Sequence, residues 1–417
     1  MKILILSYAC EPGAGSEYGV GWNVPFTLAQ KYPEHEVYVA TRNRCRKKIE
    51  EELQALGLKN LHFVFYDIPK WLYYKNEMKS RWGEQYNYIL WQLFVRKKVK
   101  RTVDKCQIDI VHHLTFNQYR TPSPGFYLNT PFVFGPIGGA ETINPAFDRD
   151  LSSHTLKKEK IRRKGYDLRL FYWWMGKKNN LKYILCSTKE NLTRLEPYCK
   201  GHQVEVLPAI GFSPDDIPQV QMSEKSNNFE MIYAGKALDW KGVKLFLNAT
   251  ALAFLKKGIN NFNIKLIGIR FEKEQEMVKA WVTELGLERS VEIIPFIERD
   301  KLIAILAKSS LSVYPAFRDS GSMSVLEASA LGCPTICFDA GGQDAFPDDT
   351  LIKVKVTDNY NENLHGFASK LLWAYQHPNE LNEIGKKAKS YVYTHLTWEK
   401  KVEYFMEIYQ KLHEKGI

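Results

Sequence analysis

The sequence predicts an α/β protein with two doubly wound domains, each built on a parallel β-sheet with helices on both faces. Three observations support this fold class. The 417 residues suffice for two domains, and 45% hydrophobic with 25% charged residues is typical of a globular protein with a large core. Short apolar runs alternate with helical segments in both halves of the chain. Between the halves, residues 213–228 are polar, contain proline and lack periodicity, as expected of a linker.

The first domain, residues 1–212, is expected to begin with a buried strand, because residues 1–7 are almost continuously apolar. A glycine-rich stretch follows to Trp22, and then a helical segment ends at Gln30. Further strands of the same sheet are expected at residues 36–41, 61–65, 108–115, 131–134, 183–187 and 204–208.

The ends of these strands are the candidate binding elements of the first domain, because ligands of an open parallel sheet bind beyond the carboxyl ends of its strands. The glycine turn after the first strand is only a weak dinucleotide signal, since its spacing does not fit Gly-x-Gly-x-x-Gly. The turns and strand ends concerned carry Gly13, Gly15, His112, His113, Gly138 and Gly139.

The second domain, residues 229–396, repeats the same alternation. Residues 229–236 are expected to form a strand that leads into a turn, and Lys241-Gly242 opens the next helix, so Lys236 and Lys241 lie on either side of this turn. Strands are expected at residues 262–269, 290–295, 311–315 and 334–338, and helices at 274–285, 300–309 and 325–331. A last amphipathic helix is expected within residues 397–417.

A loop and a helix between two strands of the second domain form the principal candidate site. The loop from Asp319 to Ser324 is rich in hydroxyl groups and opens onto the helix from Val325 to Leu331. The first turn of a helix has unpaired N–H groups and a partial positive charge, so this end favours phosphate. Glu327 lies one turn inside the helix, where a ribose attached to that phosphate would meet its carboxylate.

This pattern resembles the signature of a known family. Asp319 and Glu327 form an acid-x7-Glu pattern, with a Leu-Glu-Ala triplet around Glu327 and Gly332-x-Pro334 after it. The pattern is similar to that of retaining glycosyltransferases of family GT4, which have the GT-B architecture. The resemblance implies two Rossmann-like domains that face each other across a cleft. It also implies that Asp319, where the family usually has Glu, faces the donor sugar, and that Glu327 binds the ribose hydroxyls.

The resemblance implies roles for other candidate residues. Lys236 and Lys241 would stabilise the diphosphate leaving group as cations, together with backbone amides of the loop. The final helix would pack back on the first domain, and the segment around Gly13 is similar to a mobile loop that closes over the donor diphosphate. The substrate-binding residues predicted in this way are Gly13, Gly15, Ser16, Glu17, Gly138, Gly139, Ser320, Gly321, Ser322, Met323, Ser324 and Glu327.

The implied chemistry requires no protein base. In the front-face mechanism usually described for the family, the departing phosphate accepts the proton of the acceptor, so a histidine would contact the donor sugar instead. Neighbouring residues of a strand face opposite sides, so only one of His112 and His113 can serve, and we prefer His113. Because lysine and amides can carry the leaving-group charge, we expect no cofactor and no metal ion.

The net charge of +11 is concentrated in two stretches that also contain aromatic residues. Residues 157–182 carry a net charge of +8 and residues 93–105 one of +5. A nucleic-acid site is disfavoured, because no recognised binding module is present. Either these stretches are solvated helix faces over buried aromatics, or residues 71–105 and 157–182 lie on an anionic membrane, with Trp173 and Trp174 at its interface.

The sequence therefore predicts a metal-independent, retaining hexosyltransferase that uses a UDP- or GDP-sugar. The acceptor would be a surface glycan or a lipid-linked glycan, of the lipopolysaccharide, capsule or exopolysaccharide type. A nucleotide-sugar 2-epimerase of the same architecture and a non-catalytic nucleotide-sugar-binding protein are the alternatives. The chain lacks a long apolar run, and its N-terminal apolar run is too short for a secretory signal, so we expect a cytoplasmic protein, at most peripheral on the inner face of the cytoplasmic membrane.

Overall fold

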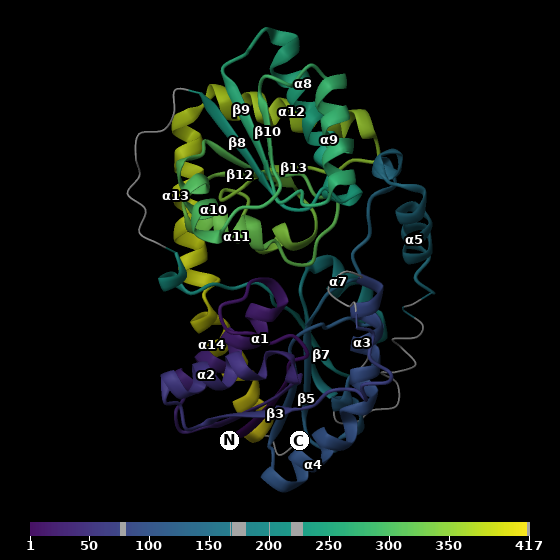
Figure 1. Cartoon of the computed structure of the whole chain (residues 1–417), viewed down its shortest axis with the longest axis vertical. Helices are drawn as coiled ribbons and strands as arrows, with labels where there is room; N and C mark the ends of the chain where they lie inside the picture. The colour runs from purple at the N-terminus through teal and green to yellow at the C-terminus, as the bar shows by residue number, and fades with distance from the viewer. Residues whose placement is uncertain (76–80, 167, 169–180, 200, 218–227, 415–417) are drawn as a thin grey trace. The chain divides into compact units, whose positions relative to one another are not determined.

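The computed structural model describes residues 1–75, 81–166, 168, 181–199, 201–217 and 228–414 (Figure 1). Contacts divide the chain into two compact units. Unit 1 comprises Met1–Ala140, Gly165–Gly211 and Trp398–Ile417, and unit 2 comprises Glu141–Lys164 and Phe212–Thr397. Each unit is built on a parallel sheet, which confirms the predicted fold class.

The predicted first domain, residues 1–212, includes one segment that belongs to the other unit in the structure. Residues 141–164, assigned from the sequence to the first domain, belong to unit 2. Ile143, Phe147 and Leu151 lie in the hydrophobic core of that unit, and burial of their apolar side chains keeps the segment there. The sequence gives no local signal for this exchange, because the apolar partners of the segment are distant along the chain.

The final helix, α14 (Trp398–Glu414), belongs to unit 1, where its buried face packs beside helix α1 (Ser16–Lys31). Of the predicted linker, Pro214–Asp216 form a short 3-10 helix in unit 2. Residues 218–227 of that linker lie outside the described residues.

The sheet of unit 1 has the strand order β3-β2-β1-β4-β5-β6-β7. Its strands are β1 (Lys2–Leu6), β2 (Glu36–Thr41), β3 (Leu61–Phe65), β4 (Ile110–His113), β5 (Phe132–Ile137), β6 (Leu181–Cys186) and β7 (Gln203–Val206). Besides α1 and α14, its helices include α2 (Arg46–Leu56), α3 (Arg81–Phe94), α4 (Arg96–Cys106) and α7 (Lys189–Leu195).

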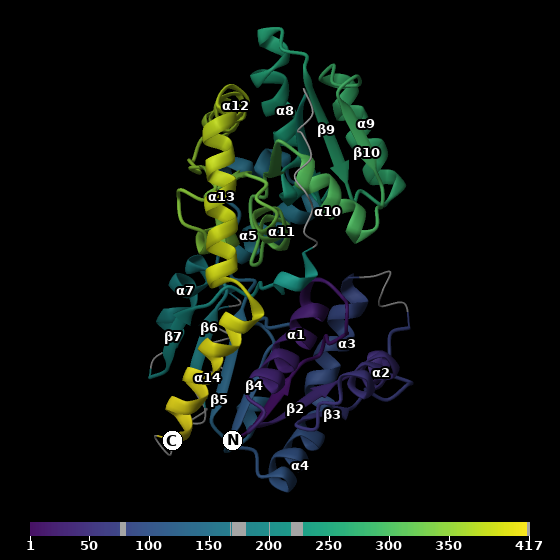
Figure 2. The ribbon, with the colours of Figure 1, turned by 90° about the vertical axis from the view of Figure 1, so that its left-hand side faces the viewer.

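Alternate residues of β1 cover opposite faces of this sheet. Ile3 and Ile5 pack in a core with α1 and α14, whereas Leu4 and Leu6 pack in a second core with α3, α4 and α7. These five helices are labelled in Figure 2. Helices on both faces explain why the central strands read as continuous apolar runs.

Helix α1 begins at Ser16, earlier than predicted, so Ser16 and Glu17 are helical rather than part of the loop. Two glycines inside the helix allow it to contact the preceding loop. A Cβ atom on Gly21 would lie 1.8 Å from the Ala9 carbonyl oxygen, and one on Gly19 would lie 2.3 Å from that of Ala14. The glycine-rich composition therefore serves helix packing as well as the turn.

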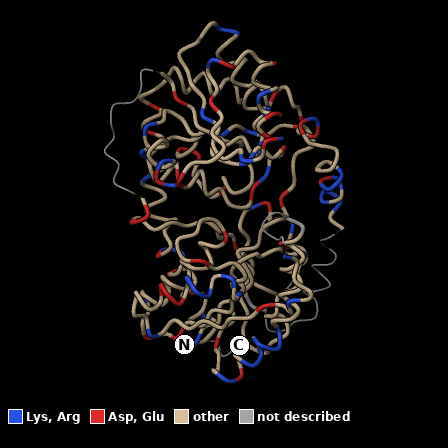
Figure 3. The backbone as a smooth tube through the Cα atoms, viewed as in Figure 1, with Lys and Arg blue, Asp and Glu red and all other residues tan. Residues whose placement is uncertain are grey.

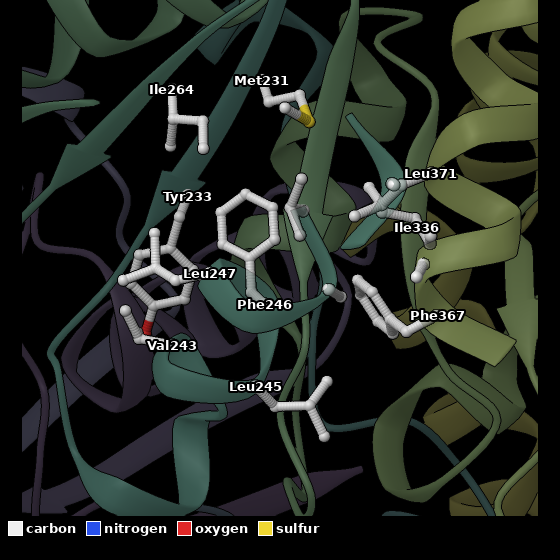
Figure 4. Packing of buried hydrophobic residues seen from close by; sticks show 14 of the residues in the cluster. Met231, Tyr233, Val243, Leu245, Phe246, Leu247, Ile264, Ile336, Phe367 and Leu371 are labelled. Carbon is white, nitrogen blue, oxygen red and sulfur yellow. The ribbon is translucent and has the colours of Figure 1, made fainter. Parts of the chain in front are cut away.

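The sheet of unit 2 has the strand order β10-β9-β8-β11-β12-β13. Its strands are β8 (Phe229–Ala234), β9 (Phe262–Ile267), β10 (Val291–Ile294), β11 (Leu311–Tyr314), β12 (Thr335–Phe338) and β13 (Ile352–Val354). Its helices are α5 (Ser153–Arg163), α8 (Val243–Ala253), α9 (Glu272–Glu284), α10 (Arg299–Lys308), α11 (Met323–Ala330), α12 (Tyr360–Gln376) and α13 (Pro378–His395) among the described residues. Side chains from β8, β12, α8 and α12 meet in its core, where Phe246 lies among Tyr233, Ile336 and Phe367 (Figure 4).

Each sheet has a point at which the strand order reverses direction. In unit 1 this point lies between β1 and β4, and in unit 2 between β8 and β11. The loops that leave the carboxyl ends of two such neighbouring strands run to opposite sides and leave a binding crevice. In unit 2 these are the loops that carry Lys241 and Asp319.

Candidate active site

Lys241 and Asp319 form the centre of the candidate site in unit 2. The Lys241 ammonium bonds to a carboxylate oxygen of Asp319 and donates to the Tyr314 hydroxyl over 2.9 Å. Tyr314 donates to the same carboxylate oxygen, and the Gly321 N–H donates to the other oxygen over 3.2 Å. Burial, and then the neighbouring Asp319 charge, raise the pKa of Tyr314 well above its usual range, so its hydroxyl stays protonated. The aspartate is thus fixed by one cation and two further donors.

The two loops that carry this cluster are bonded to each other. The Phe317 N–H donates to the Trp240 carbonyl oxygen over 2.9 Å. Gly242 has a φ of +71°, and a Cβ atom there would lie 2.0 Å from the Pro315 carbonyl oxygen. Glycine is therefore needed at this position, and the resulting close contact holds Lys241 against the Asp319 loop.

Helix α11 begins at Met323, two residues before the predicted start, so Met323 and Ser324 provide first-turn amides. The first N–H groups of a helix have no acceptor within the helix, and Ser322 does not cap them with its side chain. Ser322 is buried and Ser320 and Gly321 are half-buried in the loop before it. This end of α11 has the donors and the partial positive charge that favour a phosphate.

Glu327 is four residues into α11 and its side chain is 21% exposed. Burial raises the pKa of its carboxyl, whereas the positive charge of Arg299 opposes the rise. The Arg299 guanidinium lies 3.6 Å from a Glu327 carboxylate oxygen. Arg299 opens α10, so a residue that the sequence reading did not single out orients the predicted ribose-binding acid.

Lys236 differs from Lys241 in its surroundings. Its side chain is exposed, and its backbone carbonyl accepts a hydrogen bond of 2.7 Å from the Tyr233 hydroxyl. Among the described hydrogen bonds, none joins Lys236 to Asp319. The structure thus brings together Lys241, Asp319 and the start of α11, and leaves Lys236 on the exposed side of the turn after β8.

In unit 1, the glycine turn and the loop after β4 are linked. Gly13 has a φ of +68°, and both Gly13 and Gly15 are exposed. Glu17 accepts a hydrogen bond of 3.1 Å from the Phe116 N–H. These two loops follow the neighbouring strands β1 and β4, as the strand order requires.

The two histidines at the end of β4 face opposite sides of the sheet, as predicted from the alternation of strand side chains. His112 contacts helix α14: its Nδ1 lies 2.5 Å from the Tyr409 hydroxyl, and its Nε2 lies 2.8 Å from the Gly135 carbonyl oxygen. His113 is also fully buried, with its Nε2 at 3.0 Å from the Thr115 carbonyl oxygen. Its Nδ1 has no partner among the described residues. Burial lowers the pKa of His112 to about 4 and that of His113 to about 3, so both are neutral at pH 7.

The turn Gly138-Gly139 follows β5 and is bonded to the loop after β4. The Gly138 N–H donates to the Asn117 carbonyl oxygen over 3.0 Å. The Arg120 guanidinium donates to the Gly139 carbonyl oxygen over 3.1 Å. The candidate residues of unit 1 therefore belong to three loops at one edge of its sheet.

The two carboxylates of an Asp-x-Asp triplet in unit 2 form hydrogen bonds with other side chains of the protein. Asp148-Arg149-Asp150 is an Asp-x-Asp triplet, but Arg163 bonds to both carboxylate oxygens of Asp148, at 2.5 and 3.0 Å. The Tyr360 hydroxyl donates to Asp150 over 2.8 Å. In the part of the chain that the structure describes, no group of three or more His, Cys, Asp or Glu is arranged to hold a metal ion.

The basic residues of the first stretch lie mainly on α4, and those of the described part of the second stretch lie mainly on α5 (Figure 3). On α4, Val99 and Val103 are buried, whereas the exposed side carries Lys97, Lys98, Lys100, Arg101 and Lys105. Trp71, which precedes this helix in the chain, is 81% exposed. Trp173 and Trp174 lie outside the described residues. Within the described ranges, no helix has the length and apolar character needed to cross a lipid bilayer.

The sequence reading missed Tyr314, which ends β11 and touches both Lys241 and Asp319. Its position at the end of a buried strand is typical of a core residue, so its hydroxyl gave no separate signal. The sequence reading also gave no role to Arg318, the residue before Asp319, which pairs with Glu159 at 2.8 Å.

Comparison with known proteins shows a family match and similar folds. Residues 216–391 match the family described as glycosyl transferases group 1. A D-inositol 3-phosphate glycosyltransferase from Arthrobacter sp. (strain FB24) is 22% identical over 133 residues, which are 31% of this chain and 32% of that protein. The match thus spans about a third of the length of this curated relative.

Two solved structures are similar over the full chain. Sucrose-phosphate synthase from Thermosynechococcus elongatus has a TM-score of 0.69 at 15% identity, covering 99% of both chains. HepE from Anabaena, in complex with UDP and glucose, has a TM-score of 0.63 at 14% identity, covering 99% of this chain and 100% of that one. At such identities the likeness establishes the fold, which is the predicted GT-B architecture. The chain therefore has the GT-B fold, and its residues 216–391 match the family described as glycosyl transferases group 1.

Proposed function

We propose that the protein is a retaining hexosyltransferase of the GT4 type that uses a UDP- or GDP-sugar and needs no divalent metal. The observation that carries this proposal is the bond between Lys241 and Asp319 at the point where the strand order of unit 2 reverses, in the loop that leads into α11. Glu327 lies one turn inside that helix. The acceptor is proposed to be a surface glycan or a lipid-linked glycan.

Each group has a role in this proposal. Lys241 and the first-turn amides of α11 bind the diphosphate and stabilise the charge that develops as it leaves. Glu327 accepts hydrogen bonds from the ribose hydroxyls, and Asp319 orients the donor sugar. The departing phosphate oxygen takes the proton of the acceptor, so no side chain acts as the base. Lys236 is proposed to supply a single charge near the phosphates, and Gly13, Gly138 and His113 are proposed to contact a substrate.

A thermal-shift panel of UDP, GDP, ADP and CMP with their sugars tests the donor class. A ligand that binds only the folded state at 100 times its Kd adds about 2.7 kcal/mol to the unfolding free energy. We expect UDP or GDP, and the corresponding sugar nucleotides, to raise the melting temperature. A panel without any such rise contradicts the proposal.

Product analysis tests the reaction. Nuclear magnetic resonance of the first product should show the anomeric configuration of the donor retained, and the rate should be unchanged by a chelator. Loss of activity with chelator and its return with Mn²⁺ or Mg²⁺ would contradict metal independence. An epimerase would change the donor sugar without an acceptor, and a binding protein would bind the donor without hydrolysing it even slowly.

A peripheral membrane contact is proposed for the exposed side of α4 together with Trp71. Its lysine and arginine residues would attract anionic lipid head groups, each adding about 1 kcal/mol near the surface. Co-sedimentation with anionic liposomes should therefore weaken as salt rises. Replacing Lys97 and Lys98 by Glu should abolish binding, and retained binding would contradict the proposal.

A further inference from the structure

The segment Glu141–Lys164 is contributed to unit 2 by the middle of a stretch that otherwise builds unit 1. It contains the short 3-10 helix Pro145–Asp150 and helix α5. Three of its contacts reach the two loops that carry Lys241 and Asp319. We call this segment the brace.

The first contact is a buried ion pair. Glu159 of α5 is 1% exposed, and one of its carboxylate oxygens accepts from the Arg318 guanidinium at 2.8 Å. Its other oxygen accepts from the Ile143 N–H at 2.7 Å, and Arg162 lies 3.6 Å from the first. Arg318 immediately precedes Asp319 in the chain. Because both oxygens of the buried Glu159 carboxylate accept hydrogen bonds, the carboxylate restricts the position of Arg318 and of the backbone that carries it.

The second and third contacts fix the two loops separately. The Phe147 ring stacks on Phe317, two residues before Asp319, with ring centroids 4.1 Å apart and planes 8° apart. The Ser152 N–H donates to the Asp239 carboxylate over 2.8 Å, two residues before Lys241. The brace therefore contacts the approach to both members of the Lys241–Asp319 pair.

We propose that the brace sets the geometry of the donor site, and that Glu159 is a positioning residue that acts on Asp319 through Arg318. This inference rests on the proposed function, because it concerns the use of Asp319 toward a donor sugar. Glu159 touches neither Lys241 nor Asp319 in any described contact. Its effect is expected on the orientation of the Asp319 carboxylate rather than on the α11 amides or on Glu327.

The test variant is Glu159→Gln, which keeps the size of the side chain and removes its charge. Its matched control is Glu230→Gln, which breaks the ion pair of Glu230 with Lys265, at 2.8 Å, in the same unit. Glu230 is the second residue of β8 and lies near the amino end of that strand, whereas the loop of Lys241 follows its carboxyl end. We expect the kcat of Glu159→Gln to fall by about tenfold or more, since a misplacement remote from the chemistry can cost ~10²-fold.

A comparison of two ligands separates positioning from general loosening. The first ligand is the nucleotide that the wild type binds, UDP or GDP, and its Kd should not change in Glu159→Gln. The second ligand is the corresponding sugar nucleotide, and Glu159→Gln should no longer bind it more tightly than the nucleotide alone. Equal weakening of both ligands, or equal effects of Glu159→Gln and Glu230→Gln on kcat, would overturn the proposal. If Glu159→Gln does not fold, Phe147→Leu removes the stacking contact and should give the same pattern.

Hydrogen exchange tests the brace without any substrate. The amide of Gly321 bonds to the Asp319 side chain, and that of Gly342 bonds to its carbonyl oxygen at 2.9 Å. Both amides should exchange faster in Glu159→Gln than in the wild type and in Glu230→Gln. Unchanged exchange refutes the brace. Faster exchange in Glu159→Gln, together with a wild type that turns over no sugar nucleotide, would support the brace and reject the proposed function.

Discussion

The Lys241 ammonium bonds to the Asp319 carboxylate across 78 positions of sequence. The pair forms because β8 and β11 are hydrogen-bonded neighbours at which the strand order of unit 2 reverses. The cation proposed to meet the donor phosphates is therefore also the cation that orients the acid proposed to face the donor sugar. Substitutions at either residue should for this reason affect both functions.

Replacing Lys241 by Met should lower kcat/KM by about 10²–10³-fold, because the loss of one preorganised group that stabilises the leaving charge costs roughly 3–4 kcal/mol. Sugar transfer measured over a range of donor concentrations gives this ratio. Lys236→Met is the matched control and should lose less, since the Lys236 side chain is exposed. A larger loss at Lys236 would show that the structure points to the wrong lysine.

Tyr314→Phe removes one hydroxyl from the cluster and leaves the buried ring in place. We expect kcat to fall about tenfold while the unfolding free energy falls by only about 0.5–1.5 kcal/mol, the usual net value of one hydrogen bond. Urea denaturation and steady-state kinetics of the same preparation give both quantities. Full activity of Tyr314→Phe would mean that Lys241 and Gly321 suffice to orient Asp319.

The two histidines should differ in kind. His112→Ala should lower stability, because the ring bonds to Tyr409 and Gly135 and packs 4.7 Å from the Phe405 ring. His113→Ala should lower turnover more than His112→Ala. The Nδ1 atom of His113 has no hydrogen-bond partner among the described residues, so it is available for a contact with the donor sugar. Kinetics corrected for the folded fraction rank the two variants, and the reverse ranking would reject His113 as the donor-contacting residue.

Stability should depend on pH through the same histidines. Because burial lowers the folded-state pKa of His112 to about 4, below the ordinary value of 6.5, its contribution is complete above pH 6.5 and is lost as the pH falls toward 4. The slope is about 1.4 kcal/mol per pH unit for one group. Urea unfolding from pH 7 to 4 should show a shallower loss for His112→Asn than for the wild type, and parallel curves would contradict a neutral buried His112.

Much of the fold follows from local sequence. The strands at 36–41 and 61–65 have the predicted bounds, because continuous apolar runs between helical segments are typical of buried parallel strands. Asp319, Glu327 and a helix after the loop were also predicted, because their spacing is a local pattern, although α11 begins two residues earlier than predicted. Lys241 could be predicted from its turn, although its pairing with Asp319 could not.

The sequence by itself determined the fold class, the two sheets and the candidate loop from Asp319 to Ser324, since these depend on hydrophobic periodicity and short spacings. Only the tertiary structure decided that Tyr314 completes the Lys241–Asp319 pair, and that residues 141–164 belong to unit 2, where Glu159 pairs with Arg318. Strand order and the partner of a buried charge depend on contacts between segments far apart in the chain. No local pattern of residues encodes such contacts, because they are selected by the burial and charge pairing of the whole unit.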